Sequence, residues 1–197
     1  MRGTISGPSS TSDEKLRQAT VGELERLDGP VILEKYNPAW PAKYAREADR
    51  IRAALRDRAI RIEHIGSTAV PGLIAKPIID ILLVVDDSAN EASYVPALEA
   101  AGFLLRIREP DWYEHRLFKS QDASINLHVF TIGSKEIERI LIFRDWLRIN
   151  EADRNLYART KKSLASRKWK YTQNYADAKS EVVEAILVRA KTSPAKR

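Results

Sequence analysis

Hydrophobic residues along this chain change their spacing several times, and each spacing indicates a helix or a strand. Tyr44, Ala48, Ile51 and Leu55 recur every three or four residues, which predicts an amphipathic helix over residues 41–58. Residues 60–65 alternate as a strand does, and the continuous apolar run 78–85 is typical of a buried central strand. Further strands are expected at 31–33, 103–107, 112–118 and 124–130, and further helices at 16–27, 90–101, 134–149, 151–169 and 173–191.

These elements divide the chain into four segments. Residues 1–30 read as a flexible N-terminal arm with a short helix, because the first 14 residues are rich in Ser, Thr and Gly and lack a hydrophobic period. Residues 31–132 alternate helices and strands, which predicts an α/β (α+β) core with a mixed β-sheet and flanking helices. Residues 133–191 form C-terminal helices packed on that core, with Asn150 and Thr172 as the expected N-caps of the last two, and 192–197 form a flexible tail.

Composition limits the classes of protein that this chain can be. A length of 197 residues with 44% hydrophobic and 30% charged residues is enough for one substantial core. No apolar run reaches the roughly 20 residues of a membrane helix, and the N-terminus has no signal-peptide pattern, so we expect a soluble cytoplasmic protein without a membrane partner. The absence of cysteine excludes disulfides, thiolate metal sites and a catalytic thiol.

The positive charge is concentrated near the C-terminus. The formal net charge is +6, and residues 131–197 carry 16 Lys or Arg against 8 Asp or Glu. Such a field favours an anionic partner, which can be a nucleotide, a phosphorylated metabolite or a nucleic acid.

A glycine-rich turn followed by a carboxylate in an apolar strand is the strongest chemical signal. Gly66, Ser67 and Thr68 come directly after a strand and can turn the backbone toward an anion with N–H and hydroxyl groups, although such a triplet is also ordinary turn chemistry. Asp80 lies inside the strand 78–85, where an ionised group is costly unless it is paired or binds a metal. An ion pair with Lys76 is the structural alternative to a ligand role for Asp80.

The run HIGSTAVPGLIAKPIIDI belongs to a set of motifs that occur in order along the chain. The others are Tyr36–Pro41 upstream and Asn126–Val129, Phe143–Arg148 and the Tyr175/Lys179 helix downstream. This set resembles the GrpB family of nucleotidyltransferase-like proteins, over residues 31 to 191. The resemblance implies the nucleotidyltransferase fold. Some members of the family are fused to dephospho-coenzyme A kinase, which associates the family with nucleotide or coenzyme metabolism.

The resemblance also implies a metal site, with a departure at one position. Enzymes of this superfold hold two divalent cations with two acids on one strand and a third acid on a neighbouring strand. Here Asp80 fills the first position, Leu82 occupies the second, and His128 is the expected third ligand. One carboxylate and one imidazole favour a single cation, Mg²⁺ or Mn²⁺ with a softer metal as an alternative. Glu63 and Glu114 are weaker candidates for an additional acid.

The remaining candidates are basic or supporting residues. The phosphate-binding set is expected to be Gly66, Ser67, Thr68, Lys76, Arg116, Arg144, Arg148 and Lys179, with solvated surface arginines as the alternative for the three arginines. His64 and Tyr175 are expected to support the turn and the Lys179 helix, and His115 is read as an ordinary surface residue. The basic segment 159–170 is read as a solvated helix face, with RNA binding as the alternative.

The sequence thus predicts a protein that binds ATP or another nucleoside triphosphate and a divalent metal. Asp80 and Ser67 are the expected catalytic residues for transfer of a nucleotidyl group to a small acceptor, or for its adenylation. The alternative, favoured by Leu82, is a non-catalytic module that binds a nucleotide or a coenzyme A-related ligand.

Overall fold

A five-stranded mixed sheet forms the centre of the protein, as the sequence predicts. The computed structural model describes residues 11–27 and 29–193. The strand order is β1 (Arg61–Ile65), β2 (Ile79–Val85), β5 (Ile125–Thr131), β4 (His115–Ser120) and β3 (Phe103–Glu109). Strands β2 and β5 pair in parallel and the other neighbours are antiparallel. The continuous apolar run 78–85 therefore lies between two neighbours, where both of its faces are covered by protein along most of its length.

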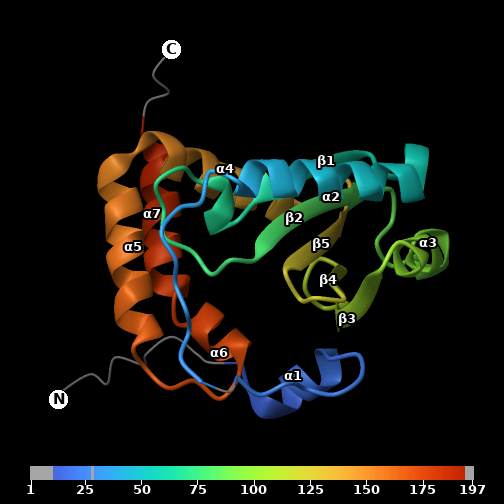
Figure 1. Ribbon diagram of the computed structural model, residues 1–197, viewed down its shortest axis with the longest axis horizontal. Helices are drawn as coiled ribbons and strands as arrows, with labels where there is room; N and C mark the ends of the chain where they lie inside the picture. The colour runs from blue at the N-terminus through green and yellow to red at the C-terminus, as the bar shows by residue number, and fades with distance from the viewer. Residues whose placement is uncertain (1–10, 28, 194–197) are drawn as a thin grey trace.

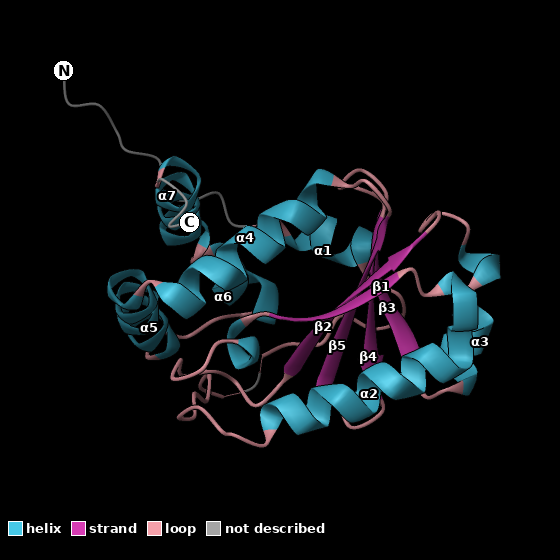
Figure 2. Cartoon of the chain, turned by 90° about the horizontal axis from the view of Figure 1, so that it is seen from above, coloured by secondary structure: helices cyan, strands magenta, loops and turns pink. Residues whose placement is uncertain are grey.

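One face of the sheet carries the main hydrophobic core. Helices α2 (Trp40–Leu55) and α3 (Val95–Ala100) cover this face, as Figure 2 shows. Ile51 and Leu55 of α2 pack with strand residues such as Ile81, Leu127 and Phe118, all of which are buried. The amphipathic spacing of residues 41–58 correctly predicts this contact.

The opposite face is only partly apolar. Helix α4 (Lys135–Ile149) packs through Ile137 on Ile65, Leu82 and Phe130. Helices α5 (Glu151–Ala165), α6 (Thr172–Asp177) and α7 (Ser180–Thr192) follow beside it (Figure 1). The part of this face that α4 does not cover presents polar side chains, and it becomes the wall of a cleft.

The N-terminal residues pack across that cleft. Helix α1 (Asp13–Ala19) is followed by a bridge from Thr20 to Ile107 of β3, and the Leu27 amide donates to the Lys170 carbonyl at 3.0 Å. Residues 11–27, which the sequence predicts to be a flexible arm with a short helix, therefore connect the β3 edge of the sheet to the segment before α6. The helix expected at 16–27 lies earlier and ends at Ala19. The first ten residues and the tail from 194 lie outside the described residues.

Several predicted elements differ in the structure. Residues 31–33 form no strand, because the segment makes only a single bridge, between Glu34 and Ala75. The helix expected at 173–191 is two helices, and the chain changes direction at Ala178 and Lys179. Strand β4 begins at His115 because Tyr113 and Glu114 adopt positive φ in the turn before it. Among the described residues, no helix combines the length and apolar character needed to cross a membrane.

The two expected N-caps have different outcomes. The Asn150 side chain accepts from the Asp153 amide at 2.9 Å and begins α5, as predicted. The N-cap of α6 is Tyr171 and not Thr172, and the Tyr171 amide donates to the Asn174 side chain. Asn174 rather than Thr172 therefore supplies the side-chain cap.

We expect Asn150→Ala to lower the free energy of unfolding by about 1 kcal/mol, because the substitution removes a side-chain cap. Ser134→Ala is the matched control, since Ser134 is the N-cap of α4 but makes no side-chain cap hydrogen bond. Urea unfolding followed by circular dichroism measures both. Equal losses in the two variants would contradict the assignment of the Asn150 cap.

Candidate functional site

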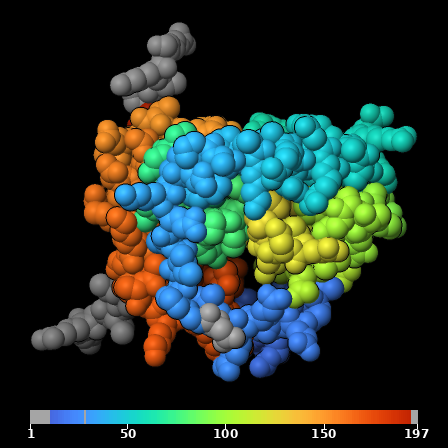
Figure 3. Space-filling model, viewed as in Figure 1, coloured from blue at the N-terminus to red at the C-terminus, as the bar shows by residue number. Residues whose placement is uncertain are grey.

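A cleft of about 780 Å³ lies over the polar half of the sheet. Its walls are strands β2, β5 and β4, helices α4 and α5, the junction of α6 with α7, and the N-terminal residues 16–27. Figure 3 shows the blue N-terminal residues closing the molecule below the strands and beside the orange C-terminal helices. The expected site residues that line this cleft are Gly66, Ser67, Lys76, Asp80, His128, Arg144 and Lys179.

Asp80 is the carboxylate at the centre of the cleft. Its Oδ1 accepts a hydrogen bond from Asn126 Nδ2 at 2.9 Å and lies 3.8 Å from His128 Nε2. Asn126 is directly opposite Asp80 in the parallel register of β2 and β5, and His128 is two residues further along β5. Burial opposes ionisation of Asp80, but a protonated His128 ring, the Asn126 amide and the charge of Lys76 outweigh it and hold the pKa of this carboxyl below its ordinary value. Asp80 is therefore an ionised acid with His128 beside it.

Gly66 makes room for the Asp80 carboxylate. The residue has φ of 68° and ψ of −167°, a conformation that favours glycine. A Cβ added at this position would lie 2.3 Å from Asp80 Oδ2. The glycine expected for phosphate binding therefore also has a steric role, because it lets the carboxylate approach the backbone of the turn.

The turn after Gly66 divides its two hydroxyls between the cleft and the core. Ser67 lines the cleft, next to Tyr157. Thr68 is buried, and its hydroxyl is hydrogen-bonded to His64 Nε2 at 3.0 Å. The His64 ring stacks on Tyr44 with the ring centroids 4.7 Å apart. His64 therefore lies beneath the turn, in the supporting position expected for it, whereas Thr68 points away from the cleft and is removed from the phosphate-binding set.

Three lysines lie near Asp80, and two of them, Lys76 and Lys179, line the cleft, whereas Lys161 is buried behind it. Lys76 precedes β2, Lys161 belongs to α5, and Lys179 stands at the junction of α6 and α7. The lysine ion pairs of residues 11–27 and 29–193 involve Lys119 and Lys170, and none involves these three side chains. The alternative of a structural Lys76–Asp80 ion pair is thus not what the structure contains.

Aromatic rings and a carbonyl group hold the lysines in place. The Lys179 ammonium lies 4.3 Å from the Tyr175 ring centroid and that of Lys76 lies 5.8 Å from it, so Tyr175 supports two cations by cation–π contacts. Lys161 is only 3% exposed and donates to the Ile74 carbonyl. Burial lowers the pKa of Lys161 to about 7 and that of Lys179 to about 8, and repulsion between lysines contributes to both shifts. A bound anion would relieve this repulsion.

Two of the expected phosphate-binding arginines instead anchor α4 to the turn. Arg144 donates to the His64 carbonyl and forms ion pairs with Glu63 and Asp145, each at 2.8 Å. Arg148 donates to the Ala69 carbonyl at 3.0 Å. Because each arginine already satisfies carbonyl or carboxylate partners, both are better described as fixing the two ends of the Gly66 turn.

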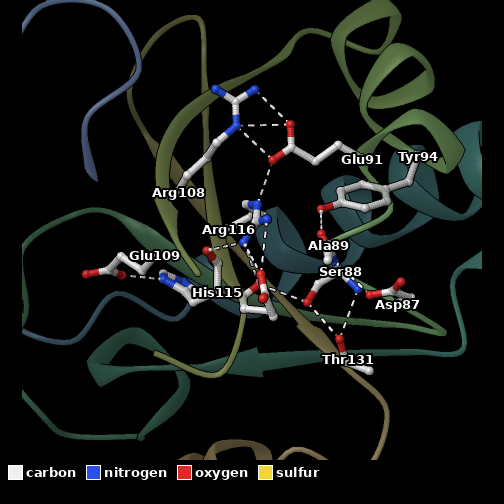
Figure 4. Close-up of polar contacts among 11 residues, drawn as sticks. Asp87, Ser88, Ala89, Glu91, Tyr94, Arg108, Glu109, His115, Arg116 and Thr131 are labelled. Atoms are coloured by element: carbon white, nitrogen blue, oxygen red, sulfur yellow. Dashed lines mark hydrogen bonds and ion pairs between the residues drawn. The ribbon is translucent and has the colours of Figure 1, made fainter. Parts of the chain in front are cut away.

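Arg116 is not an anion contact in the cleft. It alternates with the cleft-facing residues of β4, and it forms ion pairs with Glu91 at 2.6 Å and Glu114 at 3.2 Å on the other face of the sheet (Figure 4). Its assignment to the phosphate-binding set is wrong, because one step along a strand reverses the face. Glu114 is paired with Arg116 and Glu63 with Arg144, and neither carboxylate lines the cleft that contains Asp80.

The donor set for a metal is small. Leu82, in place of a second acid, is 0% exposed and packs in the cluster under α4. No group of three His, Asp or Glu residues with metal-binding geometry occurs in the part of the chain that the structure describes. Asp80 and His128 are thus two protein donors, and any cation between them needs further ligands from water or substrate.

The structure adds site residues that the sequence did not reveal. His115, read as a surface residue, is 3% exposed, and its ring is hydrogen-bonded to His128 and to Glu109. Lys161 belongs to the basic segment read as a solvated helix face, yet it is buried beside the cleft. The residues of one face of β4 and β5, namely His115, Leu117, Lys119, Asn126 and His128, share parity, so knowledge of the register would have brought them together.

Comparison with known proteins identifies the family. The family model described as GrpB protein matches residues 30–189. The chain belongs to the GrpB family. A UPF0157 protein of Halalkalibacterium halodurans is 56% identical over 94% of this chain and 95% of its own length, and one of Streptomyces coelicolor is 41% identical over 91% and 97%. A Mycolicibacterium paratuberculosis protein named dephospho-CoA kinase is 32% identical over 70% of this chain and 40% of its own length.

Solved structures agree with this family assignment. The conserved protein GrpB from Enterococcus faecalis has a TM-score of 0.72 and 31% identity, over 81% of this chain and 96% of that one. The Cid1 poly(U) polymerase with bound Mg 3′-dATP has a TM-score of 0.51 and 15% identity, over 68% of this chain and 44% of that one. The second likeness shows the fold alone. The GrpB chain thus has the nucleotidyltransferase-like fold that its motifs imply.

We expect Gly66→Ala to destabilise the protein by about 1–3 kcal/mol, because the new Cβ meets the Asp80 carboxylate in a strained backbone conformation. Gly72→Ala is the control, since Gly72 also has a positive φ (79°) but no atom lies within 4 Å of the point that its Cβ would occupy. Thermal unfolding separates the clash from the backbone strain. An equal loss of stability in both variants would show that a Cβ at position 66 does not clash with Asp80.

Proposed function

We propose that this GrpB protein binds a nucleoside triphosphate and a divalent cation in the cleft and transfers the nucleotidyl group to a small acceptor. The observation that carries the proposal is the set of three lysines without carboxylate partners around Asp80. The nucleotidyltransferase-like fold supports the reaction class but does not by itself assign a reaction.

The charges of the cleft suit a polyphosphate. Lys76, Lys161 and Lys179 place up to three positive charges near one carboxylate, and buried cations that form no ion pair with a carboxylate of the described residues are costly until an anion binds. A cleft of about 780 Å³ lies within the 300–1,000 Å³ range that is usual for small-molecule sites. Lys76, Lys179 and Ser67 line the cleft and would contact the phosphates, and buried Lys161 would add its charge from behind them. Arg144 and Arg148 would keep the turn in place.

The residues present fit one cation. Asp80 offers an ionised carboxylate, and His128 Nε2 faces it at 3.8 Å, so the two donors converge on the same space. Buried Leu82 leaves no place for a second acid. Phosphate oxygens and water would complete the coordination, as is usual for Mg²⁺ and Mn²⁺ in nucleotide sites. A bound cation would supply charge stabilisation at the phosphates.

In the proposed reaction an acceptor oxygen forms a bond to the α-phosphorus, and the bond from this phosphorus to the oxygen that bridges to the β-phosphorus breaks. Pyrophosphate leaves with the electron pair, and the lysines stabilise its charge. The proton of a hydroxyl acceptor passes to solvent, whereas a carboxylate acceptor has none to lose. The second case is an adenylation when ATP is the substrate.

The second candidate function is a binding module without catalysis, and buried Leu82 favours it. Relatives named dephospho-CoA kinase make a coenzyme A-related ligand a reasonable probe for this alternative. RNA binding through residues 159–170 is less well supported, because Lys161 is buried in the cleft wall and Lys170 forms an ion pair with Asp13.

We expect calorimetry to detect binding of ATP or another triphosphate that requires Mg²⁺ or Mn²⁺ and is at least about tenfold weaker in Asp80→Asn, because the variant removes the carboxylate beside the cation. Asp86→Asn is the control, since Asp86 is exposed just beyond the far end of the same strand. Release of pyrophosphate in the same samples identifies an enzyme, and binding without release identifies the module. Absence of triphosphate binding with every metal would reject the enzyme, and absence of coenzyme A binding as well would reject the module.

We also expect triphosphate affinity to fall as the pH rises from about 7.5 to 9. Burial lowers the pKa of Lys161 to about 7 and that of Lys179 to about 8, so above pH 8 both are mainly uncharged in the free protein. A polyphosphate binds their charged forms and must therefore restore these protons. The affinity should fall by up to about tenfold per pH unit for each lysine that must take up a proton on binding. Calorimetry in buffers of different ionisation enthalpy measures this proton uptake. Lys161→Met should reduce the pH dependence of triphosphate affinity, whereas the control variant Lys162→Met should leave it unchanged.

A further inference from the structure

Four polar side chains form a row across the strands at the floor of the cleft. Glu109 of β3, His115 of β4 and His128 of β5 follow one another toward Asp80 of β2. His115 Nδ1 lies 2.7 Å from Glu109 Oε2, and His115 Nε2 lies 3.1 Å from His128 Nδ1. Figure 4 shows the contact between Glu109 and His115. The row ends at His128 Nε2, 3.8 Å from Asp80.

The hydrogen bonds of this row fix where the ring protons lie. An ionised Glu109 can only accept, so His115 donates from Nδ1. The Nε2 atom of a neutral His115 is then an acceptor, and His128 must donate to it from Nδ1. This arrangement leaves the lone pair of His128 Nε2 directed toward Asp80, at a distance too long for a hydrogen bond between them.

Packing keeps the row in this arrangement. The His115 ring stacks on Phe130 at 4.8 Å between centroids, and the edge of Trp112 contacts it at 5.1 Å. His115 is only 3% exposed, so protein side chains and not water surround its ring. A ring fixed in this way can hold the tautomer of His128 without touching a ligand itself.

We propose that Glu109 and His115 are positioning residues that hold His128 with its proton on Nδ1, so that Asp80 and His128 Nε2 bind a first-row transition-metal ion in preference to Mg²⁺. A hydrogen bond to the distal nitrogen is the usual way in which proteins orient a metal-binding histidine. Imidazole suits Zn²⁺, Fe²⁺ and similar ions, Mn²⁺ binds most weakly of the first-row series, and Mg²⁺ prefers oxygen ligands. The inference rests on the cation site of the proposed function and specifies which ion that site selects.

The test measures metal binding without nucleotide. Mn²⁺ alone, followed by electron paramagnetic resonance, and Zn²⁺ and Mg²⁺ as competitors give the affinity order. We expect both transition metals to bind more tightly than Mg²⁺, and we expect His115→Met to weaken Mn²⁺ binding by about 10–100-fold. His115→Gln should restore much of this loss, because its amide oxygen can accept from His128 Nδ1. Glu109→Gln should give a smaller loss, and Glu114→Gln, whose carboxylate contacts Arg116, should give none.

A second measurement does not depend on any variant. Nitrogen NMR of the histidine rings in the metal-free wild-type protein reports the tautomer of His128, and we expect the proton on Nδ1. A proton on Nε2, a preference for Mg²⁺, or equal Mn²⁺ affinity in His115→Met and the wild type would overturn the inference. These outcomes are independent of turnover, since a protein that selects Mn²⁺ through His115 but transfers no nucleotidyl group would reject the proposed function alone.

Discussion

The position of the Asp80 carboxylate is the constraint on which the rest of the site depends. Its strand is buried between two others, so an ionised group there needs partners that the sheet itself supplies. Asn126 and His128 provide them from the parallel neighbour, and Gly66 leaves the space in which Oδ2 lies. Arg144 and Arg148 then hold the Gly66 turn from α4. Gly66, Arg144, Arg148 and strand β5 thus together fix the position of the Asp80 carboxylate.

The C-terminal helices give this carboxylate its electrostatic surroundings. The change of direction between α6 and α7 places Lys179 over Tyr175, and α5 brings Lys161 to the same wall. Burial lowers the pKa values of these lysines, and no carboxylate pairs with them in the described part of the chain. An anion with several charges is the partner that we propose for these lysines. The N-terminal residues 11–27, which precede the region matched by the family model, close the cleft on the opposite side.

Leu82 stands at the position where nucleotidyltransferases carry a second acid, and the polar side chains of the cleft lie on neighbouring strands. Leu82 packs with Phe130 and Ile137 under α4, so that position belongs to the core. The polar chemistry lies on β5 and β4 instead, where His128 and His115 form the row toward Glu109. At the proposed cation site, imidazole in place of carboxylate would change the class of cation that binds, and residues behind the ligand would orient its ring.

The sequence by itself determined the mixed sheet, the helix on 41–58, the Gly66 turn and the solitary acid at Asp80, because these depend on local periodicity and on the cost of a charge in an apolar strand. The resemblance to the GrpB family also pointed to His128. Only the tertiary structure decided the roles of Arg116, His115 and Lys161. The face of Arg116 depends on where β4 begins, the partners of His115 depend on strand order, and Lys161 becomes buried only when α5 packs against the cleft. Register and packing join residues far apart in the chain, and local spacing carries no information about them.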